Sequence, residues 1–185
     1  MTTPSTPSRP ARADRPVPYF RPTRPYRSAL RPTAALLLLA APLACSGGDG
    51  GAPQVAVPTP QGKAAGYCGR LAERLPDTVD GQERRATEPA SQLTAAWGDP
   101  AVRLRCGVPR PAELTPGSEH YNPYAETAVV NGVDWLIAET DDGRRFVTAG
   151  RKAFVEVTVP SEYAPEVNPL TDLADAVKAA VPTVL

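Results

Sequence analysis

The sequence predicts an α+β fold, in which a mostly antiparallel sheet carries an N-terminal and a C-terminal helix packed on one face. Three observations predict it. Strand patterns cluster in the middle of residues 63–185, helical patterns flank them, and two cysteines fall on the apolar sides of a helix and of a strand. Strands that follow one another without alternating helices favour antiparallel pairing, with the helices on one side of the sheet. A chain of 185 residues has room for one such domain.

The individual elements follow from the spacing of apolar residues. Residues 63–75 place their apolar side chains on one helical face, and Pro76 ends that run. Residues 168–181 carry the apolar stripe of a second helix, with Pro169 in its first turn. Between the helices, apolar and polar residues alternate in several short runs, as in half-buried strands. The expected strands are 93–97, 102–106, 133–137, 146–149 and 155–159.

Two of the three cysteines lie on apolar sides of expected elements. Cys68 belongs to the apolar face of the first helix, and Cys106 shares the side of Val102 and Leu104 on its strand. Both therefore point toward one core, where they can form a disulfide that joins helix to sheet or remain two buried thiols. We expect the disulfide, because such a bond persists in an exported protein.

The first 44 residues have the organisation of a signal peptide. Seven arginines and one acid precede Ala34, a net charge of +6, whereas the rest of the chain holds 13 basic and 19 acidic residues, a net charge of −6. The apolar run 34–44 follows, about half of the roughly 20 residues that a membrane-spanning helix needs. A basic region, a short apolar region and a small residue before a cysteine predict export. The alternative is a buried helix, but such a helix would be amphipathic.

Cys45 follows Leu43-Ala44 directly and precedes Ser46-Gly47. This arrangement resembles a bacterial lipobox, which implies a diacylglycerol on Cys45 and attachment to the outer face of the plasma membrane. Pro42 departs from the pattern, which prefers leucine there, so a secreted or signal-anchored protein is the alternative. Residues 45–62 are rich in Gly and Pro without periodicity, and we expect them to form an extended tether before the domain at 63–185.

Several motifs of this domain are similar to those of the actinobacterial family of unknown function DUF3515. They are Cys68-Gly69-Arg70-Leu71, Leu75-Pro76-Asp77-Thr78-Val79, Ala96-Trp97-Gly98-Asp99-Pro100, Leu104-Arg105-Cys106-Gly107-Val108-Pro109-Arg110-Pro111, Val130-Asn131-Gly132-Val133-Asp134-Trp135 and Val155-Glu156-Val157-Thr158-Val159-Pro160. The resemblance spans roughly 67–182. It implies an exported or lipid-anchored envelope protein and implies no activity.

The chemistry-bearing residues predict no catalytic centre, cofactor or metal site. The single histidine, His120, lies in a Pro-rich stretch, and its neighbours Ser118 and Glu119 do not make a triad by adjacency. One histidine does not supply the usual multi-histidine zinc site. The acidic body also argues against nucleic acid as a partner.

The polar side of the expected sheet is the candidate binding face. It carries Arg103, Arg105, Asp134, Glu156 and Thr158. An antiparallel sheet often leaves one face in water, so these residues form either a solvated surface or a docking surface. We therefore expect a non-enzymatic lipoprotein that binds or scaffolds an envelope protein or cell-wall polymer. The alternative is a hydrolase or other enzyme that acts on cell-wall material, with a site assembled from scattered residues such as Asp134, Glu156 or His120.

Overall fold

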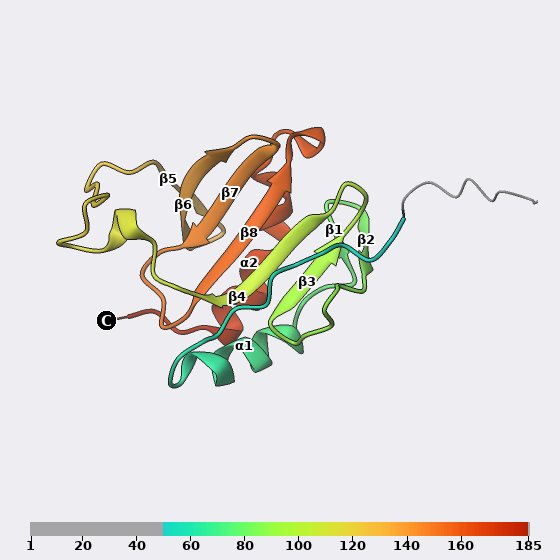
Figure 1. Cartoon of the computed structure of the whole chain (residues 1–185), viewed down its shortest axis with the longest axis horizontal. Coiled ribbons are helices and arrows are strands. Elements are labelled where there is room, and N and C mark those ends of the chain that lie inside the picture. Colours follow the sequence, from blue (N-terminus) through green and yellow to red (C-terminus); the bar gives the residue numbers. More distant parts are fainter. Residues whose placement is uncertain (1–49, 185) are drawn as a thin grey trace, which may run out of the picture. The chain divides into compact units, whose positions relative to one another are not determined.

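A computed structural model describes residues 50–184 (Figure 1). The predicted signal peptide at 1–44, the predicted lipidation site at Cys45 and the start of the predicted tether lie outside the described residues. No helix within 50–184 has the length and apolar character needed to cross a bilayer. The helices are α1 (Ala64–Ala72) and α2 (Asn168–Ala180), with two short 3-10 turns, η1 (Ala112–Leu114) and η2 (Ser161–Tyr163). The strands are β1 (Thr78–Val79), β2 (Gln82–Arg85), β3 (Thr94–Trp97), β4 (Val102–Val108), β5 (Thr127–Val130), β6 (Val133–Thr140), β7 (Gly143–Thr148) and β8 (Phe154–Pro160).

The strands form one sheet in the order β1-β2-β3-β4-β8-β7-β6-β5, and every neighbouring pair is antiparallel. The antiparallel sheet predicted from the clustered strand patterns is therefore confirmed. The sheet consists of two meanders, β1 to β4 and β5 to β8, which meet where β4 pairs with β8. This central pair brings residues about 50 positions apart in the sequence side by side, as in the register Arg105↔Glu156.

The main core lies between the sheet and the two helices. Alternate residues of the strands point into it, including the fully buried Trp97, Trp135 and Phe146. The apolar stripe of α2 packs against them through Leu170, Leu173 and Val177, among others. Figure 1 shows α2 behind the strands, and α1 contacts both α2 and β4. We call the opposite side of the sheet its outer face.

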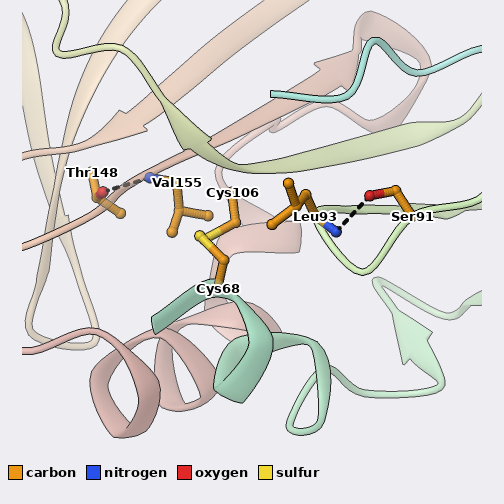
Figure 2. The surroundings of a disulfide bond; sticks show 6 residues. All are labelled: Cys68, Ser91, Leu93, Cys106, Thr148 and Val155. Atoms are coloured by element: carbon orange, nitrogen blue, oxygen red, sulfur yellow. Dashed lines mark hydrogen bonds between the residues drawn. A yellow bond between two sulfur atoms is a disulfide. The ribbon is translucent and has the colours of Figure 1, made fainter. Parts of the chain in front are cut away.

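A disulfide joins α1 to the sheet. Cys68 and Cys106 are bonded, with their Cα atoms 5.5 Å apart, and both are buried in the main core. Figure 2 shows the bond reaching from α1 up to β4 beside Val155 of β8, whose amide donates to the Thr148 hydroxyl at 3.0 Å. The predicted disulfide is therefore confirmed. It links the first helix covalently to the centre of the sheet, beside the packing of Leu71 in the same core.

The segment that follows Gly50 differs from the expected extended tether. Residues 50–62, which we call the strap, lie along the outer face, and Figure 1 shows this segment crossing in front of the strands. Val55 is only 3% exposed, and its amide donates to the Glu88 carbonyl at 2.9 Å. Arg85 Nη2 donates to the carbonyls of Gly50 and Gly51, at 3.1 and 2.8 Å. The strap is thus part of the folded domain, held largely through backbone carbonyls and amides.

Candidate functional site

The outer face carries two neighbouring rows of polar side chains across β4, β8 and β7. In one row, Arg103 pairs with Thr158, which pairs with Arg145. In the next row, Arg105 pairs with Glu156. Directly paired residues of an antiparallel sheet point to the same side. The structure therefore brings together four of the five residues that the sequence placed on this face, and it adds Arg145.

Arg105 is the centre of this group and binds both the sheet and the strap. Its Nη1 donates to Glu156 Oε1 at 2.9 Å, and its Nε donates to the carbonyl of Ala56 in the strap at 2.8 Å. Arg145 Nη1 lies 4.0 Å from the other carboxylate oxygen of Glu156. Glu156 is only 8% exposed, so both arginines compensate a largely desolvated charge. We conclude that Arg105 holds the sheet and the strap together, whereas Arg145 keeps most of its donors available.

Among the described residues of this face, Arg103 is a cation without a hydrogen-bond or ion-pair partner. It is half-buried, and its side chain makes no hydrogen bond or ion pair with the described residues 50–184. It borders two hollows, of about 330 and 400 Å³, which lie on either side of it along the strap. A guanidinium presents five donors in a planar fork that matches carboxylate and phosphate groups. Arg103 is therefore the residue of this face best placed to bind an anionic group.

A third hollow continues the face on the other side of the Arg105–Glu156 pair. It has a volume of about 320 Å³ and is lined by residues 108–113 together with Arg145 and Glu156. The outer face is thus a shallow surface between the strap and the segment after β4. Its floor is charged, which suits polar docking better than burial of an apolar ligand.

Asp134 does not join this group. It lies on β6, opposite Val129 of the edge strand β5, and β7 separates it from Glu156 on β8. Its charge acts instead on Arg151. Burial lowers the pKa of Arg151 below its ordinary value, and the nearby Asp134 carboxylate partly offsets that shift. Asp134 therefore belongs to the surroundings of Arg151.

The comparisons with known proteins agree with the motifs. The family described as a protein of unknown function, DUF3515, matches residues 29–185. The chain belongs to this family. The match covers all of the described DUF3515 domain, including the strap, and the predicted membership is confirmed. No curated protein and no solved structure matches the chain.

The remaining chemistry-bearing residues of the DUF3515 domain stay apart. His120 is exposed in the segment between β4 and β5, where its amide donates to Ser118 Oγ at 3.2 Å. Within residues 50–184, no group of three or more His, Cys, Asp or Glu side chains is arranged to hold a metal ion. Sequence reasoning missed Arg145, although its position directly before the core residue Phe146 signals that it faces outward.

Proposed function

We propose that this DUF3515 protein is an exported lipoprotein of the cell envelope whose domain binds an envelope protein or cell-wall polymer. In this proposal a lipid on Cys45 anchors the chain to the outer face of the plasma membrane. The partner docks on the outer face of the sheet and makes charged contacts with Arg103 and Arg145. The domain acts by binding and performs no chemical step.

Two features support export. The first is the order of a basic region, a short apolar run and Cys45 in the sequence. The second is the Cys68–Cys106 disulfide, since such bonds form and persist mainly outside the cytosol. These features are independent, because the disulfide lies in the domain and the apolar run precedes it.

One observation carries the binding role: Arg103 and Arg145 flank Thr158 on a face where Arg105 is already occupied. Residues 50–184 hold 13 Lys and Arg and 18 Asp and Glu, a net charge of −5. Two available arginines in one row of an acidic domain indicate an anionic partner, because complementary charge supplies specificity and speeds encounter.

The strap limits how far such a domain can stand from its anchor. Gly50, whose carbonyl accepts a hydrogen bond from Arg85, is five peptide steps from Cys45. A fully extended chain spans at most about 3.6 Å per residue, so this distance is at most about 18 Å. In this proposal the end of the strap at Gly50 therefore stays close to the membrane surface, in contrast to a domain on a long flexible tether.

Mass spectrometry of the mature protein tests the anchor. We expect a first residue at Cys45 that carries a diacylglycerol, and loss of membrane association in Cys45→Ala. An unmodified Cys45, or cleavage at another position, would reject lipidation and leave a secreted or signal-anchored protein.

Site-specific crosslinking in cells tests the binding face. A photoreactive amino acid at Thr158 should give a defined crosslinked product. Arg103→Glu should abolish that product, because it reverses the charge beside the crosslinker and breaks no hydrogen bond of the described residues. Arg70→Glu on α1 makes the same charge change away from the outer face and should leave the product intact. A product that persists in Arg103→Glu would remove the outer face as the docking surface.

A further inference from the structure

A hollow larger than the three of the outer face is bordered by none of Arg103, Arg105 and Arg145. It has a volume of about 650 Å³, within the range of small-molecule pockets of about 300–1,000 Å³. Its walls come from the long segment between β4 and β5, from the β7–β8 connection and from Val184 near the end of the chain. Long irregular segments on a rigid scaffold often form binding sites.

The charged residues that line this hollow are mostly basic, whereas the domain as a whole has a negative net charge. Three cations line it, Arg110, Arg151 and Lys152, against the single acid Glu113. The domain as a whole has an excess of acids, as counted above. Arg151 is only 6% exposed, and its Nη1 and Nη2 donate to the carbonyls of Val181 and Gly132, at 2.7 and 3.3 Å. A buried positive charge in the wall acts through a poorly screened environment. We call these three residues the cationic side.

The rest of the lining is largely apolar. Tyr121 and Val184 are among the few large apolar residues of the described chain that stay exposed, at 45% and 56%. Both border this hollow, so exposed apolar surface gathers here, as it does at ligand sites. We call the following residues the apolar side: Leu114, Pro116, Tyr121, Phe154 and Val184.

We propose that this hollow binds a small amphiphilic anion, with its acidic group at the cationic side and its apolar body at the apolar side. The acidic group is a carboxylate or a phosphate, since both accept hydrogen bonds from guanidinium and ammonium groups. Binding in this hollow would require neither export nor the outer-face arginines.

A pair of fluorescent probes tests the charge requirement. 8-Anilinonaphthalene-1-sulfonate is an amphiphilic anion, and N-phenyl-1-naphthylamine is its uncharged counterpart. We expect the sulfonate to bind the wild-type protein. Lys152→Glu should weaken that binding by roughly tenfold, the loss expected for a charge-assisted hydrogen bond, and leave the uncharged probe unaffected. Lys152 suits this test because it is exposed and its side chain makes no hydrogen bond with the described residues.

Two further variants make the test specific. Val184→Ser removes apolar surface from the apolar side and should weaken the binding of both probes. Lys63→Glu makes the same charge change as Lys152→Glu at an exposed residue that borders none of the hollows described above, and it should change neither affinity. Absence of sulfonate binding, or equal affinity of wild type and Lys152→Glu for the sulfonate, would overturn the proposal.

Competition identifies the acidic group. Decanoate and decyl phosphate carry the same apolar chain with a carboxylate or a phosphate, and decanol carries no charge. Displacement of the sulfonate probe by decanoate alone would assign a carboxylate ligand, and displacement by decyl phosphate alone would assign a phosphate. Equal displacement by decanol would show that charge plays no part, and the proposal would be wrong.

Discussion

Arg105 donates to Glu156 across the central β4–β8 pair at 2.9 Å, at the point where the two meanders of the sheet meet. The same guanidinium donates to Ala56 in the strap. One side chain therefore connects three segments that are far apart in the sequence. Arg105 therefore stabilises the fold, while Arg103, two residues before it on the same strand, is available for binding.

We expect Arg105→Ala to destabilise the protein by about 2 kcal/mol, because the largely buried Glu156 would lose its main partner. Arg103→Ala should change the free energy of unfolding by less than about 0.5 kcal/mol, since it removes no contact of this kind. Urea denaturation of both variants measures the difference. Equal losses would contradict the division of roles between the two arginines.

Removal of the disulfide should lower the free energy of unfolding by more than Arg105→Ala does. Cys68 and Cys106 are 38 residues apart, and closing a loop of that length stabilises a protein by roughly 4 kcal/mol in the chain-entropy model. The double variant Cys68→Ala, Cys106→Ala should therefore have a far lower urea midpoint than wild type. Cys45→Ala is the matched control and should unfold like wild type. A double variant as stable as the control would show that packing alone fixes α1 to the sheet.

The strap should loosen when Gly107 gains a side chain. Gly107 has a φ of +90°, and an added Cβ would lie 2.6 Å from the Pro60 Cβ. We expect Gly107→Ala to destabilise the protein by about 1–2 kcal/mol and to speed hydrogen exchange of the Val55 amide, which is bonded to Glu88. Gly69→Ala places the same methyl group on α1, where no atom beyond the neighbouring helix backbone lies within 4 Å. That control should stabilise the protein by about 0.5–1 kcal/mol, and an unchanged exchange rate in Gly107→Ala would contradict the docked strap.

Stability should fall at alkaline pH through Tyr163. Its hydroxyl donates to the Pro100 carbonyl at 2.7 Å. Burial raises the pKa of Tyr163 above the ordinary value of 10.0; a hydrogen bond to the backbone of Asp99 acts against this shift, and the nearby carboxylate charges, Asp99 among them, act with it. A group whose pKa is raised on folding stabilises the protein below its unfolded pKa, and this contribution is lost as the pH rises further.

The comparison of wild type with Tyr163→Phe isolates this effect. At about pH 8 the variant should be less stable by about 1 kcal/mol, because it lacks the hydrogen bond. Above about pH 10 the difference should shrink, since only wild type loses stability by ionisation of this residue. Urea midpoints of the two proteins across this pH range measure the difference. A difference that is constant or grows with pH would contradict the raised pKa of Tyr163.

Periodicity alone predicted the central elements of the fold. Apolar residues that recur every second or every three to four positions must share one side of a strand or helix. The core strands around Leu104, Trp135 and Val157, and the direction of Cys68 and Cys106 toward one core, follow from that local rule. It failed for β2, whose sequence Gln82–Arg85 has no apolar alternation, and for β5, which follows a Pro-rich segment. Both strands form through pairing with neighbours, which their own sequences do not encode.

The candidate sites depend on tertiary structure more than the central strands and helices do. The sequence determined that Arg103 and Arg105 share the polar side of one strand, because their spacing of two residues fixes it. Only the order of the strands decided that Arg145 joins them and that Asp134 does not. The docking of the Gly- and Pro-rich strap likewise left no apolar period in the sequence. Many of its bonds to the sheet are made by backbone carbonyls, and every residue has such a carbonyl. The physical reason is the same in each case: side-chain direction is a local property, whereas proximity between distant segments is a property of the whole sheet.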